Sequence, residues 1–192
     1  MRKLLSVLAA LCAAGCFNEP EPAYKSVPAE NRVYLNDKGL KAVPEVNAKA
    51  DYLNLDRNQL EKADGVEKLT GLKWLRLNDN QLSALPDLKG LVNLRRIYLR
   101  NNKFAAVPET LKDLPALTDI DLSGNPVKEV PQWLAEKRGL KNLSFSRTQI
   151  VKLPENLEAW TSLQCLQLGD LNISAAEMAR IRSALPNVAI VF

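Results

Sequence analysis

The chain has 192 residues, 26 basic and 22 acidic side chains, and no histidine. The absence of imidazole from the sequence excludes histidine-based catalytic triads, general bases and metal sites. No Walker A or G-x-G-x-x-G run is present, so the common phosphate-binding loops are excluded as well. We therefore expect no enzyme activity, no cofactor and no metal.

Residues 1–15 have the features of an export signal. Arg2 and Lys3 precede an apolar run too short to span a bilayer, and small residues precede Cys16. The run ALCAAGC resembles a bacterial lipoprotein signal, with Ala13 where that family prefers Leu. The resemblance implies that Cys16 is lipidated and becomes the mature N-terminus. The alternative is an ordinary cleaved signal peptide with an incidental cysteine.

Removal of this signal changes both the charge and the cysteine count. Without Arg2 and Lys3, 24 basic side chains face 22 acidic ones, which gives no general argument for nucleic-acid binding. Cys12 would leave with the signal and Cys16 would carry lipid. We therefore expect Cys165 to be a free thiol, with no internal disulfide.

The composition of residues 16–30 predicts a tether between the lipid on Cys16 and the folded repeats. The stretch FNEPEPAYKSVPAE is rich in proline and glutamate and has no hydrophobic periodicity, so we expect a disordered segment with a reach of about 40 Å. In lipoproteins of this type, an Asp after the lipidated cysteine favours inner-membrane retention. Phe17 stands there instead. The resemblance thus implies a cell-envelope protein, with the outer membrane favoured over the inner.

A repeat of 22 to 23 residues dominates the rest of the chain. It is clearest in residues 94–116, which follow the spacing L-x-x-L-x-L-x-x-N-x-L-x-x-V-P-x-x-L. Repeats begin at Ala50, Leu72, Leu94, Leu117, Leu140 and Leu163. A period in this range indicates a solenoid.

The pattern resembles the leucine-rich repeat family over residues 31–192. The resemblance implies one right-handed α/β solenoid with a parallel strand in each x-L-x-L segment on its concave side. We expect about eight strands, including a degenerate first coil and a final strand after a C-terminal helix. Leucines two residues apart share one face of a strand, so the residues between them are expected to face solvent.

Asparagine recurs at one position of the repeat. A side-chain amide both donates and accepts, so it can satisfy backbone groups where the chain turns off the strand. We interpret this column as a structural amide ladder; its members are Asn58, Asn80, Asn102 and Asn125. Thr148 and Leu171 continue the column, which indicates that the ladder fades toward the C-terminus.

The opposite, convex side carries helix signals. Pro86, Pro108, Pro131 and Pro154 predict short helical or 3-10 turns, because proline suits the first turn of a helix. Ser174 and Glu177 predict a capping box that opens the C-terminal helix. Trp160 is expected in the core. Trp133 is expected to be exposed, as a secondary contact surface.

The strand face carries the candidate binding site. Aromatic and arginine side chains, the types enriched at binding hot spots, crowd the first four repeats. The predicted partner-binding residues are Tyr52, Trp74, Arg76, Arg96, Tyr98 and Arg100. The same side chains can instead stack on one another along the sheet, and both interpretations can hold. Asp119 and Asp121 resemble a cation site, but Arg96 lies abreast of Asp119, so charge pairing is favoured.

Two classes of function remain open. The first is a monomeric, membrane-tethered, non-catalytic module that binds a protein or peptide on the N-terminal half of its concave face. The second is a binder of envelope polysaccharide, whose sugar rings would meet the flat aromatics. An enzyme is a weak third, because bacterial effector ligases with similar repeats carry a separate catalytic domain.

Overall fold

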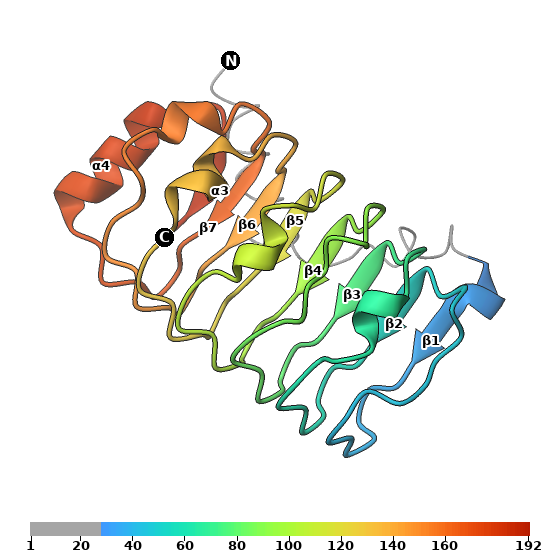
Figure 1. The fold of residues 1–192 in the computed structure, drawn as a ribbon. Coiled ribbons are helices and arrows are strands. Elements are labelled where there is room, and N and C mark those ends of the chain that lie inside the picture. Colours follow the sequence, from blue (N-terminus) through green and yellow to red (C-terminus); the bar gives the residue numbers. More distant parts are fainter. Residues whose placement is uncertain (1–27) are drawn as a thin grey trace.

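The computed structural model describes residues 28–192. Within this range, eight strands form one parallel sheet in the order β1 to β8, so each strand pairs with the next one along the chain (Figure 1). The predicted solenoid and its strand number are confirmed. The predicted signal peptide over residues 1–15, the lipidated Cys16 and most of the tether lie outside the described residues.

Every strand is three residues long and begins at the same point of its repeat. The strands are β1 Arg32–Tyr34, β2 Tyr52–Asn54, β3 Trp74–Arg76, β4 Arg96–Tyr98, β5 Asp119–Asp121, β6 Asn142–Ser144, β7 Cys165–Gln167 and β8 Ala189–Val191. Their middle residues are all apolar and stand in register, for example Leu75 with Ile97. These side chains point away from the concave face and start one continuous core.

Short helices cover the convex side (Figure 1). They are η2 Val66–Lys68, η3 Glu109–Leu111, α3 Gln132–Glu136, η4 Leu157–Ala159 and α4 Ala175–Ala184, whereas η1 Ala29–Asn31 directly precedes β1. Pro108 and Pro131 directly precede η3 and α3, as predicted. In residues 28–192, no helix has both the length and the apolar character needed to cross a bilayer.

The prediction of a helical turn after Pro86 is wrong. Asp87 Oδ1 accepts a hydrogen bond from Lys89 N at 3.0 Å, which is a local turn that competes with a helix. Leu88 N donates to Thr110 Oγ1 of the next repeat at 2.7 Å. Both backbone donors are therefore satisfied without a helix.

The first turn of the described chain includes the last two residues, 29 and 30, of the expected tether. The tether was expected to run to residue 30, yet η1 spans Ala29–Asn31. Asn31 N donates to Pro28 O at 3.0 Å, and Asn31 Nδ2 donates to Asp51 Oδ2 at 3.1 Å. These bonds tie the turn to the second repeat, so the tether ends before η1.

Buried asparagine amides satisfy the inner turns. Asn102 Nδ2 donates to Leu77 O at 2.9 Å and Leu99 O at 3.0 Å, and Asn102 Oδ1 accepts from Leu82 N at 3.0 Å. Asn58, Asn80 and Asn125 repeat this geometry in their own turns. At the next position, Thr148 Oγ1 is buried without a partner among the described residues.

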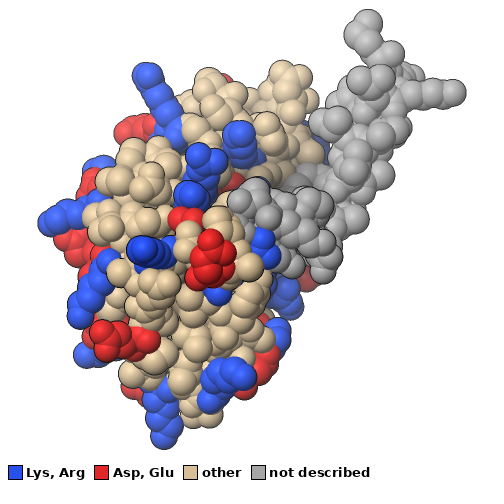
Figure 2. Space-filling view, turned by 90° about the vertical axis from the view of Figure 1, so that its right-hand side faces the viewer, with Lys and Arg blue, Asp and Glu red and all other residues tan. Residues whose placement is uncertain are grey.

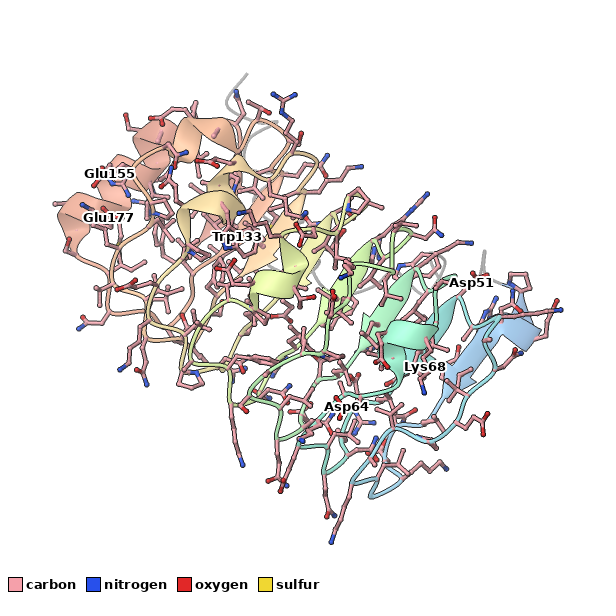
Figure 3. The ribbon with its side chains drawn as sticks, viewed as in Figure 1. Asp51, Asp64, Lys68, Trp133, Glu155 and Glu177 are labelled. Carbon is pink, nitrogen blue, oxygen red and sulfur yellow. The ribbon has the colours of Figure 1, made fainter. Side chains whose placement is uncertain are left out.

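The C-terminal helix is capped in a different way from the prediction. Ser174 Oγ accepts a hydrogen bond from Glu177 N at 3.2 Å, which is the expected first half of a capping box. The Glu177 carboxylate instead accepts from Leu153 N at 2.9 Å and pairs with Arg180 at 2.8 Å (Figure 3). The Arg180 hydrogen bond holds the pKa of Glu177 below its usual value. The helix is thereby tied to the preceding repeat.

Trp160 lies in the core, as predicted. It is buried, and its Nε1 donates to Leu134 O at 2.8 Å. Trp133 on α3 was expected to be exposed, but it is half-buried and packs against the core. Its Nε1 donates to Glu109 Oε1 at 3.1 Å on the convex side (Figure 3).

Candidate functional site: the concave strand face

Strands β2, β3 and β4 bring the predicted aromatic residues together. Parallel register places Tyr52 beside Trp74 and Trp74 beside Arg96. In the neighbouring column, Arg76 stands beside Tyr98. Because adjacent strands lie about 4.8 Å apart, these side chains form one continuous surface. The concave face thus has the composition that the sequence predicts.

The three rings are less exposed than expected. Tyr52, Trp74 and Tyr98 have exposed fractions of 3%, 8% and 3%. One reason is that a large ring on a strand reaches over its neighbours. Tyr52 packs against Trp74, and its ring centroid lies 5.4 Å from that of Tyr34. The expectation that alternate strand residues simply face solvent is therefore wrong for these rings.

Stacking also joins an arginine to an aromatic ring. The guanidinium carbon of Arg76 lies 5.2 Å from the centre of the Tyr98 ring, which is a cation–π contact. Arg76 Nε also lies 2.7 Å from Asp56 Oδ2. Arg76 is consequently held in place by groups of both neighbouring repeats. Such a side chain offers a ligand a fixed charge.

Trp74 contributes an unsatisfied donor to this surface. Its Nε1 is buried and has no hydrogen-bond partner among the described residues. A buried N–H without an acceptor costs about 1–3 kcal/mol, and nearly all such groups in proteins are paired. An oxygen acceptor at this point would remove that cost. Trp74 Nε1 is therefore the donor on this face that a ligand acceptor would satisfy.

The predicted charge pairing between strands is confirmed. Arg96 stands opposite Asp119 in the register, with 3.8 Å between Arg96 Nε and Asp119 Oδ2. Asn142 Nδ2 also donates to Asp119 Oδ1 at 2.6 Å. Among residues 28–192, no group of histidine, cysteine and acidic side chains has the arrangement of a metal site.

A second ladder runs along the strand ends, and sequence reasoning missed it. Asp56 Oδ1 accepts from Asn78 N at 2.8 Å, and Asn78 Oδ1 accepts from Arg100 N at 2.9 Å. Further along, Ser146 Oγ accepts from Gly169 N at 3.1 Å. Each short side chain thus serves the backbone one repeat later. We call this column the strand-end ladder; its signal in the sequence is an oxygen-bearing side chain recurring every 22 to 23 residues.

Arg100 interrupts the strand-end ladder. A guanidinium only donates, so it cannot accept from the next N–H in the column, which belongs to Ser123. Asp121 Oδ1 accepts from Ser123 N instead, at 2.9 Å. The Asp121 carboxylate is buried, and this burial raises its pKa. Hydrogen bonds from Ser123 and the charges of Arg100 and Arg147 act in the opposite direction and lower the pKa.

Cys165 corrects the prediction of a free thiol. It is buried at the start of β7 and is disulfide-bonded. The only other cysteines of the sequence are Cys12 and Cys16, which lie outside the described residues. The prediction rested on assigning one of them to the removed signal and the other to lipid.

The end of the solenoid that carries β1 has a mixed charge. Figure 2 shows this end, where basic and acidic side chains are interspersed among uncharged ones. One such pair joins Arg57 Nε to Asp37 Oδ1 at 2.6 Å. Its hydrogen bond holds the pKa of Asp37 at about 2.

Comparison with known proteins identifies the repeat. The leucine rich repeat family profile matches residues 70–127. An internalin (inlF) from Listeria monocytogenes superposes with a TM-score of 0.67 at 23% identity, covering 76% of this chain and 42% of that one. A leucine-rich repeat protein from Leptospira interrogans gives 0.53 at 25% identity, covering 80% and 52%.

The chain therefore spans about half, or less, of the length of these solved structures. No curated protein matches it. The leucine rich repeat profile thus covers residues 70–127, and the superpositions and the parallel sheet of residues 28–192 show a leucine-rich repeat fold.

Proposed function

We propose that this chain is a non-catalytic module that binds a protein or peptide on the β1–β4 half of its concave face. Leucine-rich repeat proteins generally mediate protein–protein interactions and are typically not enzymes. The proposed contact residues are Tyr52, Trp74, Arg76, Arg96, Tyr98 and Arg100.

The observation that carries this proposal is the buried Trp74 Nε1 between Tyr52 and Arg96, which has no hydrogen-bond partner within residues 28–192. A peptide carbonyl is the acceptor that a protein partner supplies in every residue. Neighbouring Arg76 is held over Tyr98 and would lose little freedom on binding. Tryptophan and arginine together account for many binding hot spots.

Two matched substitutions test the proposal. Trp74→Phe keeps an aromatic ring and removes only the N–H, whereas Trp133→Phe makes the same change on the convex side. A partner captured from envelope extract should bind the Trp74→Phe protein roughly tenfold more weakly, as expected for one buried hydrogen bond. Equal affinities for both variants, at matched melting temperatures, would move the site off this face. Recovery of envelope polysaccharide in place of protein would favour the second class of ligand.

We further propose that the mature chain is lipid-anchored through Cys16 in a bacterial envelope, with the outer membrane as its site. The support is the run ALCAAGC followed by a proline-rich stretch. One acyl chain binds a bilayer only marginally, so firm attachment implies more than one. The tether would hold the repeats away from the membrane. The anchored chain would be a monomer.

The disulfide at Cys165 conflicts with this proposal, because Cys12 would leave with the signal and lipid would occupy Cys16, so the anchored mature chain would hold Cys165 as a free thiol. A thioether-linked lipid occupies the Cys16 sulfur, so the same atom cannot also join Cys165. Mass spectrometry of the mature N-terminal peptide should show a lipid adduct, and Cys16→Ser should release the protein into the soluble fraction. Firm membrane attachment of Cys16→Ser, or a Cys16–Cys165 peptide in place of the adduct, would contradict lipid anchoring.

A further inference from the structure

We propose that residues 17–27 of this chain bind along its own concave face, as a strap that occupies the surface of β2 to β4. This rests on the proposed function and names a ligand for the same surface, the segment FNEPEPAYKSV. The segment lies outside the described residues. Its support is a covalent link, the span of the sheet, the burial of the strand face and the chemistry of the segment.

A disulfide links the far end of the sheet to the N-terminal part of the chain. Cys165 is the first residue of β7, beside Asn142 on the concave side, and it is disulfide-bonded. The other cysteines of the sequence, Cys12 and Cys16, both precede residue 17. The described chain begins at residue 28 and enters β1 at Arg32, at the opposite end of the sheet. Residues 17–27 therefore connect the two ends of one sheet.

The length of the segment matches the distance between these ends. The six strand spacings from β1 to β7 amount to about 29 Å, at about 4.8 Å for each pair. The 11 residues of the segment extend about 34 Å in polyproline II conformation, at about 3.1 Å per residue. A path on the concave side is the shorter one, because the sheet curves toward that side and the short helices lie on the other (Figure 1).

Side chains on the concave face are buried although the core lies on the other side of the sheet. Tyr98 is 3% exposed, whereas Tyr34, in the same column of the sheet at β1, is 48% exposed. Ser144, in this column at β6, is 0% exposed. The helices of residues 28–192 lie on the convex side and do not account for this burial (Figure 1). A strap from outside the described range would account for it.

The prolines of the segment suit the aromatic surface. Pro20 and Pro22 favour the polyproline II conformation, whose backbone forms no internal hydrogen bonds. Proline-rich segments in this conformation bind aromatic-lined grooves. Tyr52, Trp74 and Tyr98 provide an aromatic lining on three consecutive strands. The carbonyl groups of the segment are also acceptors of the kind that Trp74 Nε1 lacks within residues 28–192.

The charges of the segment suit the same half of the sheet. Glu19 and Glu21 are its acidic residues, and Lys25 is its one basic residue. Arg96 begins β4, and Arg100 follows that strand as an exposed side chain. Because a guanidinium matches the geometry of a carboxylate, a segment that passes over β4 would gain charge-assisted hydrogen bonds there.

The non-covalent contacts of the strap do not require the disulfide. A lipid on Cys16 would prevent a bond between Cys16 and Cys165, and the prolines and glutamates alone would then hold the segment on the face. The experiment therefore uses Cys165→Ser in every protein, so that it measures these contacts whichever cysteine is the partner.

The probe is a fluorescein-labelled peptide of the sequence FNEPEPAYKSV, added to the full Cys165→Ser chain. Pro20→Gly together with Pro22→Gly in the chain should open the strap, because glycine loses the preference for polyproline II. The opened chain should bind the peptide at least about tenfold more tightly, since an attached segment competes at a high effective concentration. Trp74→Phe in the opened chain should then weaken peptide binding about tenfold.

The matched control is Pro44→Gly together with Pro186→Gly, at two exposed prolines outside the segment. This pair should leave peptide affinity unchanged. An equal gain in the control pair, equal affinity of the opened and unopened chains, or no binding by the opened chain would overturn the strap. Equal binding of the analogue FNQPQPAYKSV would overturn the role of the two glutamates.

The protein partner captured from envelope extract separates this inference from the proposed function. If Trp74→Phe weakens the partner while opening changes neither partner affinity nor peptide affinity, the module binds as proposed and the strap is wrong. If opening strengthens peptide binding but no protein partner depends on Trp74, the strap stands and the proposed function fails.

Discussion

The two halves of the solenoid share one sheet but are stabilised by different means. Around β2 to β5, the inner turns are satisfied by buried asparagine amides such as Asn80 and Asn102. From Thr148 onward, other residues take the place of asparagine in this column. The C-terminal end is closed by α4, where Glu177 pairs with Arg180. The ladder is a repeated local device, whereas the clamp joins α4 to the preceding repeat.

This difference is consistent with the proposed binding surface in the N-terminal half. The C-terminal half uses longer helices, α3 and α4, to secure its turns. The N-terminal half secures its turns from inside, so its strand face can hold large rings such as Tyr52 and Trp74. We expect four changes to test the comparison, from the largest effect to the smallest.

Asn102→Leu should destabilise the chain by about 3 kcal/mol, because it leaves a buried N–H and carbonyl groups of the turn unpaired. Unfolding in denaturant measures this. The control is Asn93→Leu, at an exposed position whose Nδ2 donates only weakly to Thr70 O at 3.4 Å. A neutral Asn102→Leu would remove the ladder as the basis of the N-terminal half.

Glu177→Ala should destabilise by about 2 kcal/mol, since Leu153 N and Arg180 both lose their buried acceptor. Glu158→Ala, at an exposed carboxylate on η4, is the control. Hydrogen exchange should show the loss in β6 to β8 first. Equal loss of protection in β2 and β3 would mean that the clamp serves the whole solenoid.

Thr148→Asn should stabilise the chain by about 1 kcal/mol by extending the amide ladder by one turn. The present hydroxyl is buried without a partner in residues 28–192, so the amide replaces an unsatisfied group. A higher denaturation midpoint with an unchanged slope is the expected result. A lower midpoint would show that the C-terminal half cannot accommodate the ladder.

Asp121→Asn should change the pH dependence more than the stability itself. Burial raises the pKa of Asp121 above 3.8, so the folded chain favours the protonated form. Its contribution is present below the unfolded pKa and is lost as pH rises through the folded pKa. From about pH 7 to about pH 4, the unaltered chain should therefore gain stability relative to the variant. A gap that is constant with pH would contradict this assignment.

The sequence correctly predicted the features that recur with the repeat. The spacing of paired leucines gave the strands and their register, including Arg96 opposite Asp119. It also placed Trp160 in the core. These features depend only on which face of a strand or turn a residue occupies, and that follows from position in the repeat.

What could not be predicted depends on contacts between repeats. Asn78 accepts a hydrogen bond from Arg100 N one repeat later, and the spacing of residues within a single repeat does not indicate such a bond. The prediction of a helical turn after Pro86 was wrong for a similar reason, since Thr110 of the next repeat accepts a hydrogen bond from Leu88 N. The binding role of the concave residues stays a prediction.

The parallel order β1 to β8 means that each strand of the described chain bonds only to the strands next to it in sequence. Such an architecture can gain or lose a whole repeat by gene duplication or deletion without new pairing rules. A repeat inserted between β2 and β3 would lengthen the aromatic surface by one row. Evolution can thus lengthen or shorten this surface by whole repeats while the pairing of the remaining strands stays the same.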